Sequence, residues 1–172
     1  MMIQKEHVLE AVKMRDYVVP SDLIRQFNVN TFIIGAVLSD LVNDKKLIAT
    51  SVKIGGSPAY YAPEKKENIQ QLVKYLNEKD KTTFALLQNK KVLLDTEQTP
   101  LVRVSLRTIK DYAKPIEVTV NNETKLFWKW YLASDQEVQD GIRVSLLSSP
   151  QQKEIPAPLQ TMQPAPAVVQ QS

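Results

Sequence analysis

Residues 95–131 decide the fold of this chain, and they read DTEQTPLVRVSLRTIKDYAKPIEVTVNNETKLFWKWY. Thr99 can cap a helix, and Pro100 suits the first helical position, where no amide hydrogen is needed. The pattern predicts a short helix capped by Asp95, a second helix over Leu101–Tyr112, and then two strands joined by a tight turn. Asn121-Asn122 tolerates the positive backbone angles of such a turn.

Two rows of side chains run along the surface of the second of these helices. The row that should pack inward is apolar and consists of Val102, Leu106 and Ile109. The other row is displaced by one residue, about 100° around the helix, and consists of Arg103, Arg107 and Lys110. Cations in such a row can lie along phosphates or enter a major groove. We predict a nucleic-acid-binding helix, extended by Lys114; a solvated basic face is the alternative.

Composition limits the class of protein. A length of 172 residues allows one ordinary domain or two small ones, and 43% hydrophobic residues suffice for real cores. The absence of cysteine excludes disulfides and thiolate metal sites and favours a cytoplasmic location. The start, MMIQKEHVLE, carries charges where a signal peptide needs an apolar run, and no stretch approaches the ~20 apolar residues of a membrane helix. The net charge of +3 is small, so binding of nucleic acid would have to be local.

The first part of the chain has the same order of elements. The expected elements are a helix over Ile3–Met14, an extended segment at Tyr17–Val19, a helix capped by Ser21, a third helix capped by Asn30 or Thr31, a strand over Leu47–Ile54 and a return strand at Ala59–Tyr61. Placing Leu38 over Leu106 also places Thr31 over Thr99. Identity between the halves is poor, so it is the shared order that indicates two copies of one fold.

The second copy is bounded by two further helical patterns. An amphipathic stripe over Asn68–Leu76 and a separate helix over Lys79–Asn89 should precede a short strand at Val92–Leu94. After the hairpin, Ser134 and Glu137 form a capping box that predicts a closing helix to about Arg143. We therefore predict an α+β protein with domains at 1–63 and 64–147. The Pro-, Gln- and Ala-rich tail, 148–172, should be disordered.

The two copies differ on their third helix. At the positions of the cations, the first copy has uncharged and mostly small residues, namely Phe32, Gly35, Ala36 and Ser39. Small side chains let another helix approach closely, so we expect a dimerisation or docking surface; packing inside the chain is the alternative. Lys53 beside Gly55-Gly56 could approach a phosphate backbone, and a plain hairpin turn is the alternative.

The aromatic run in the last strand is a second candidate surface. Successive residues of a strand face opposite sides, so Trp128 and Trp130 share one face and Phe127 lies on the other. Two tryptophans near the surface could stack on bases or anchor a protein partner. The alternative is that the closing helix covers them.

Nothing in the sequence predicts catalysis. There is one histidine, no cysteine and no glycine-rich phosphate loop, metal-ligand cluster or nucleophile elbow. We therefore expect no enzymatic activity, metal, cofactor, small-molecule substrate or membrane association.

The elements of 21–61 and 95–131 resemble the winged helix-turn-helix superfamily, and the resemblance spans most of residues 1–146. It implies a tandem winged-helix protein that binds double-stranded DNA, as a transcriptional regulator does. Tandem winged helices also serve as protein adaptors, for example in ESCRT complexes and transcription-machinery subunits. The uncharged third helix of the first copy keeps this alternative open, with a homodimer or a protein partner held by the first copy.

Overall fold

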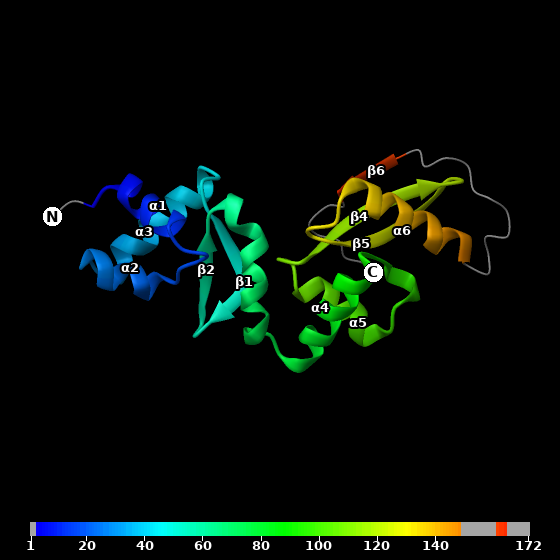
Figure 1. Cartoon of the computed structure of the whole chain (residues 1–172), viewed down its shortest axis with the longest axis horizontal. Coiled ribbons are helices and arrows are strands. Elements are labelled where there is room, and N and C mark those ends of the chain that lie inside the picture. Colours follow the sequence, from blue (N-terminus) through cyan, green and yellow to red (C-terminus); the bar gives the residue numbers. More distant parts are fainter. Residues whose placement is uncertain (1–2, 149–160, 165–172) are drawn as a thin grey trace. The chain divides into compact units, whose positions relative to one another are not determined.

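A computed structural model describes residues 3–148 and 161–164, and it contains an α+β fold with small antiparallel sheets. The chain divides into two compact units between Leu76 and Asn77 (Figure 1). Each unit has its own sheet, so each is described by itself. No helix within the described ranges is long and apolar enough to cross a membrane.

Unit 1 holds three helices, a hairpin and a 3-10 segment. In order these are α1 (Lys5–Lys13), α2 (Pro20–Phe27), α3 (Thr31–Asn43), β1 (Ile48–Ile54), β2 (Ser57–Tyr61) and η1 (Pro63–Tyr75). Its core is aliphatic and includes Val8, Val12, Val18, Leu23, Ile34, Leu38 and Leu41. Ile34, Leu38 and Leu41 lie at helical spacing along α3 and are buried, whereas Val42 is half-buried.

Local chemistry sets the ends of these helices. Asn30 accepts a hydrogen bond from the Ile33 amide at 2.9 Å, which confirms it as the cap of α3. The prediction that Ser21 caps α2 is wrong, because the helix begins one residue earlier, at Pro20. There the Asp22 carboxylate accepts from the Val19 amide at 3.0 Å. Asn28 ends α2 with φ 57°, a left-handed conformation that asparagine tolerates better than most residues.

The structure places the boundary between the units later than the sequence predicts. Residues of η1 complete unit 1, because Ile69 and Leu72 are fully buried. Polar side chains hold the same segment, since Asn68 and Gln71 donate to the two carboxylate oxygens of Asp16 at 2.9 and 2.7 Å. The predicted boundary after Pro63 is therefore replaced by one after Leu76, and Pro63–Tyr75 form a 3-10 helix rather than an α-helix.

Unit 2 contains a sheet between helices. Its elements are α4 (Glu78–Lys90), β3 (Val92–Leu94), η2 (Asp95–Glu97), α5 (Pro100–Thr108), β4 (Ala113–Val120), β5 (Glu123–Trp130), α6 (Asp135–Ser148) and β6 (Thr161–Pro164). The separate helix before β3 is confirmed, and Asn77 caps it by accepting from the Asp80 amide at 2.8 Å. The capping box is also confirmed: Glu137 accepts from the Ser134 amide at 2.9 Å, and Ser134 Oγ accepts from the Glu137 amide at 3.1 Å.

Helices cover both faces of this sheet. On one face, Phe84 of α4 lies edge-on to Trp130 of β5, with ring centroids 5.0 Å apart. On the other, Gly141 of α6 approaches Val92, which pairs with Lys129 and so shares the face of Phe127. A Cβ added at Gly141 would lie 2.9 Å from Val92 Cβ, so α6 packs on β3 at a distance that requires glycine.

The two units share a topology beyond the order of their elements. The sheet of unit 2 has the order β3-β5-β4-β6, so the short strand after the first helix pairs with the return strand of the hairpin. In unit 1, Val18 forms an isolated bridge with Tyr60 of β2, with N–H···O distances of 2.9 and 2.8 Å in the two directions. The short extended segment therefore meets the return strand in both units.

One segment of the tail is ordered, contrary to the sequence prediction. Thr161–Pro164 form β6, which pairs antiparallel with β4, Thr161 lying opposite Thr119. The outer edge of a strand presents unpaired amides and carbonyls, which gives even a polar segment partners. The prediction of a disordered tail is therefore wrong for these four residues, and its remainder, 149–160 and 165–172, lies outside the described residues.

Candidate functional site

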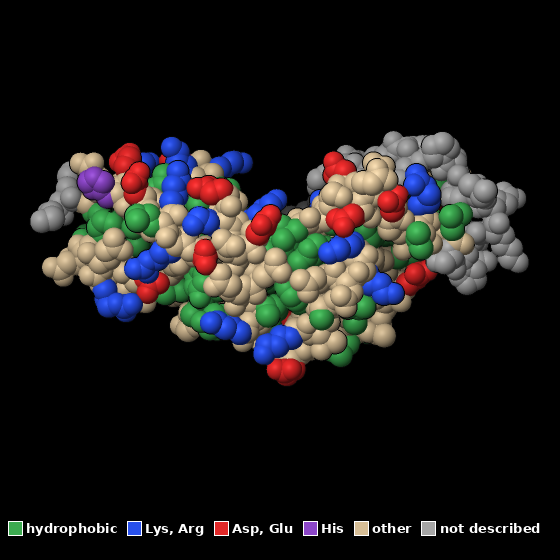
Figure 2. Space-filling view, viewed as in Figure 1, with side chains coloured by type: hydrophobic (Ala, Val, Ile, Leu, Met, Phe, Trp, Pro, Cys, Tyr) green, Lys and Arg blue, Asp and Glu red, His purple; other side chains and the backbone are tan. Residues whose placement is uncertain are grey.

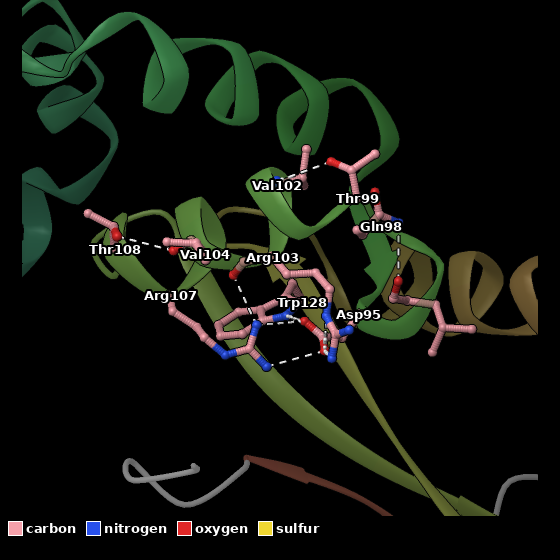
Figure 3. A network of polar contacts seen from close by, with 10 residues as sticks. Asp95, Gln98, Thr99, Val102, Arg103, Val104, Arg107, Thr108 and Trp128 are labelled. Carbon is pink, nitrogen blue, oxygen red and sulfur yellow. Dashed lines mark hydrogen bonds and ion pairs between the residues drawn. The ribbon is translucent and has the colours of Figure 1, made fainter. Parts of the chain in front are cut away.

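The centre of unit 2 is a buried carboxylate that gathers two arginines and a tryptophan (Figure 3). Asp95 accepts from Arg103 Nε at 3.0 Å, from Arg107 Nη1 at 2.8 Å and from Trp128 Nε1 at 2.9 Å. Arg103 Nη2 lies 2.8 Å from Oδ2 of the same carboxylate. The four residues come from three elements: Asp95 opens η2, the arginines lie one turn apart on α5, and Trp128 is on β5.

Opposing effects act on the carboxylate, and the sum favours its charged form. Burial raises the pKa of Asp95, but hydrogen bonds from Arg107, Trp128 and Arg103 lower it by more, so the pKa lies below the ordinary value. The Asp95 side chain is only 3% exposed, whereas those of Arg103 and Arg107 are 42% and 40% exposed. Arg107 also lies over the Trp128 ring, 5.3 Å from its centroid.

The structure breaks up the predicted basic row. Arg103 and Arg107 turn to Asp95, so one unit of their combined charge is neutralised inside the protein. The predicted helix over Leu101–Tyr112 is too long, because α5 ends at Thr108 and Lys110 lies beyond the capping residue, Ile109. The three cations therefore do not project as one row. Lys110 and Lys114 are exposed, and Lys114 Nζ donates to the Lys110 carbonyl at 2.9 Å.

Apolar side chains occupy the outward side of α5 instead. Leu101 is 61% exposed and Val104 is 56% exposed, three residues apart and therefore on the same side of the helix. The opposite side is anchored by Leu106, which is fully buried, and the helix is also held by Ser105, whose hydroxyl donates to the buried Asp80 of α4. Because α5 is fixed by these contacts, Leu101 and Val104 are held at the surface of unit 2.

The equivalent face of α3 is also open. Phe32, Gly35, Ala36 and Ser39 are all exposed, and Phe32 reaches 83%. A Cβ added at Gly35 would meet nothing within 4 Å. The alternative that these residues pack inside the unit is therefore wrong. Asp40, next in the sequence, pairs with Lys5 of α1 at 3.2 Å, and α3 itself contains no lysine or arginine.

Both tryptophans are covered, so neither is a surface anchor. Trp128 is buried beside Asp95 and Arg107, and Trp130 is buried among Phe84 and Tyr112. The assignment of Trp128 and Trp130 to partner binding is therefore wrong. The helices that cover this face are α4 and α5. The alternative expected from the sequence is that the closing helix covers the tryptophans, but α6 packs on the opposite face.

Lys53 lies near the turn of the β1–β2 hairpin in unit 1. Its side chain is exposed, and it pairs in register with Pro58, next to the turn. Gly55 and Gly56 form that turn with φ of 60° and 87°, which a residue with a Cβ would adopt only with strain. The face shown in Figure 2 carries cations and carboxylates interspersed over the described residues. Such mixing gives a weaker field than a continuous basic surface.

Sequence reasoning missed the residue that organises this site. Asp95 is predicted as a helix cap, yet the cap of η2 is Leu94 and the Asp95 side chain is buried. An acid followed at eight and twelve residues by arginines is the only sequence signal, and Trp128 is remote in the chain.

Comparison with protein-family models, with curated proteins and with solved structures finds no match for this chain.

Proposed function

We propose that this chain is a tandem winged-helix protein that holds a protein partner on the outward faces of its third helices. The fold assignment is supported by the element order and strand order that the two units share. In each unit a helix, a short extended segment, a helical turn or helix, a capped helix and a hairpin follow one another. In unit 2 the second helix is reduced to η2.

One observation carries the choice of partner. On α5 the side chains most available to another molecule are the apolar Leu101 and Val104, while the two arginines are bound to Asp95. Covering a fully exposed leucine or valine contributes about 1.5–3 kcal/mol. Turning the arginines towards phosphates would instead leave the buried Asp95 carboxylate with fewer partners, which costs free energy. A protein surface with apolar pockets therefore fits α5 better than a phosphate backbone.

Duplex DNA is the second candidate partner, and one observation favours it. Lys110 and Lys114 are exposed just after α5, and each arginine keeps about two fifths of its surface in solvent. These four cations could line one strand of a duplex without a change in the Asp95 contacts. Binding of this kind would be weak and would fall steeply with salt, because phosphate contacts release counterions.

Capture from a cell extract with variant baits tests the proposal. The baits are the full chain, Leu101→Ser/Val104→Ser, and a matched control, Met14→Ser/Leu147→Ser, in which two other exposed apolar side chains are changed. We expect the wild type and the control to recover the same stoichiometric protein, and the α5 variant to lose it. Equal recovery by all three baits would reject the role of α5.

Titration of a labelled random duplex at two salt concentrations tests the second candidate in parallel. Protein binding alone predicts no anisotropy change at either concentration. A change at low salt that disappears in Lys110→Ala/Lys114→Ala, with the α5 serine variant unaffected, would support DNA binding instead. Circular dichroism of every variant checks that each is folded.

A further inference from the structure

The sheet of unit 2 has two edge strands, β6 and β3. β6 pairs along β4 at one end of the order β3-β5-β4-β6, and β3 forms the other end. The amide of Trp130 donates to the Lys91 carbonyl at 2.8 Å. This bond shows that Lys91 and Trp130 form a hydrogen-bonded pair, and it therefore determines which residues of β3 are hydrogen-bonded to β5. In an antiparallel ladder bonded and unbonded residues alternate, so Leu93 turns its backbone groups towards β5. Val92 and Leu94 turn theirs outward.

These outward groups make an unfinished ladder. The Leu94 carbonyl accepts from Gln98 Nε2 at 3.1 Å. Within the part of the chain that the structure describes, no partner is present for the amide and carbonyl of Val92 or for the amide of Leu94. Two donors and one acceptor thus point away from the sheet in the spacing that an added strand requires.

A groove of about 710 Å³ lies along this edge, between α4 and α6. Leu86 of α4 lines one wall, and Gly141 and Val144 of α6 line the other. Val144 is among the most exposed apolar side chains of the unit. Successive side chains of a strand placed here would point alternately to the α4 wall and the α6 wall.

Charged side chains of both signs line the groove. Lys90 and Lys91 lie where β3 begins, and Glu97 lies where the strand ends. Glu137 and Asp140 of α6 also line the groove, so cations and carboxylates are mixed along it. The outward backbone groups of β3 and the apolar walls therefore select the peptide, rather than a gradient of charge.

We propose that the open edge of β3 binds an extended peptide of another protein as an antiparallel strand. The Val92 amide and carbonyl pair with one residue of the peptide, and the Leu94 amide donates to the residue two positions before it. Apolar peptide side chains contact Leu86 on one wall and Val144 on the other. This surface is separate from the outward face of α5, so each can be lost without the other.

Selection from a displayed library of random nonapeptides on the full-length chain tests the proposal. We expect enrichment of alternating apolar residues. Val144→Arg blocks one wall and should lower the affinity of a synthetic copy of the enriched peptide about tenfold or more. The matched control Leu147→Arg lies on the same helix outside the groove lining and should bind like the wild type.

Backbone chemistry separates strand addition from simple surface adhesion. Methylation of the peptide amide that faces the Val92 carbonyl removes a donor and should abolish binding, whereas methylation of the next amide, which faces solvent, should not. Val92 and Leu94 are buried but their amides have no partner in the described part of the sheet, so these amides should exchange faster than the Leu93 amide in the free protein and slow down about tenfold or more when the peptide binds. The Leu93 amide should be protected in both states.

Three results would overturn the proposal. The first is a selection in which the wild type enriches no peptides beyond those that Val144→Arg also enriches. The second is a bound peptide that leaves exchange at Val92 and Leu94 unchanged. The third is protection of these amides that rises with protein concentration in the absence of peptide, because a second copy of the chain would then occupy the edge.

Discussion

Arg107 donates hydrogen bonds to Asp95 from both terminal nitrogens, from Nη1 to Oδ1 at 2.8 Å and from Nη2 to Oδ2 at 3.2 Å. This fork-on-carboxylate contact joins α5 to the start of η2, and the Trp128 indole completes it from β5. A side chain predicted to point outward at a ligand is thereby part of what holds the unit together. The first two predictions follow from this contact.

Asp95→Asn should lower the free energy of unfolding of unit 2 by about 2 kcal/mol. The amide keeps an acceptor for Trp128 but loses the charge that holds two guanidinium groups. The loss falls short of that for a fully buried pair because the arginines are partly hydrated. Urea denaturation followed by tryptophan fluorescence measures it. Glu97→Gln, an exposed acid in the same 3-10 turn, should change stability by less than about 0.5 kcal/mol and serves as the control.

The same contact predicts how stability depends on pH. Because the folded-state pKa of Asp95 lies below the unfolded value of about 3.9, its contribution is present above that pH and is lost as the pH falls towards the folded-state pKa. The difference in unfolding free energy between wild type and Asp95→Asn should therefore be constant from about pH 7 to 5 and shrink below about pH 4. Urea titrations across this range test it. A difference that already declines at pH 6, or one that grows as the pH falls below 4, would contradict the assignment to Asp95.

Two glycines on helices should respond in opposite directions to alanine. Gly35 of α3 has open space around its missing Cβ, so Gly35→Ala should stabilise unit 1 by up to about 1 kcal/mol through helix propensity. Gly141→Ala gains the same propensity but drives a Cβ against Val92, and overpacking of this kind costs about 1–3 kcal/mol. Its net effect should be destabilising. Thermal denaturation of each variant measures these changes in stability. In the double variant Gly141→Ala/Val92→Ala the smaller side chain at position 92 should relieve part of the clash and so restore part of the lost stability.

Trp130→Ala should destabilise unit 2 by about 3–5 kcal/mol, because the ring packs edge-on to Phe84 and lies parallel to Tyr112 in a buried cluster. Leu101→Ala, at an exposed apolar position, should cost less than about 0.5 kcal/mol. Chemical denaturation compares the two. A small effect at Trp130 would mean that the ring is not buried and would restore it as a candidate surface anchor.

Phe32→Ser tests whether the open face of α3 joins two copies of the chain. The side chain is 83% exposed, so its removal should leave the melting temperature unchanged. If α3 pairs with a second copy, sedimentation equilibrium of the wild type should show a dimer that the variant loses. Ser39→Ala, on the same face without a large apolar group, is the control. If the wild type is monomeric at all concentrations, α3 does not join two copies of the chain, and a partner on this face would have to be a different protein.

The parts of the fold that the sequence predicts are those set by local periodicity. Leu106 and Ile109 are buried as their spacing indicates, and the capping box at Ser134 begins α6 as expected. Both depend on residues within one or two helical turns. The lengths of helices are less well predicted, since the ending of α5 at Thr108 depends on how the following strand joins the sheet.

The site depends on contacts that periodicity cannot supply. Arg103 and Arg107 follow the helical repeat of a basic row, but their direction is set by a carboxylate in another element and by Trp128, thirty-three residues after Asp95. The aromatic strand shows the same limit. Alternation places its rings on two faces but does not reveal that a helix covers each face.

The packing of η1 bears on how the protein can be cut into pieces for experiment. A fragment ending at Pro63 would lack η1, including the buried Ile69 and Leu72, and would expose to water the apolar surface that η1 covers beside β1, which favours aggregation. A fragment ending at Leu76 keeps that cover in place and is the shorter half worth expressing alone.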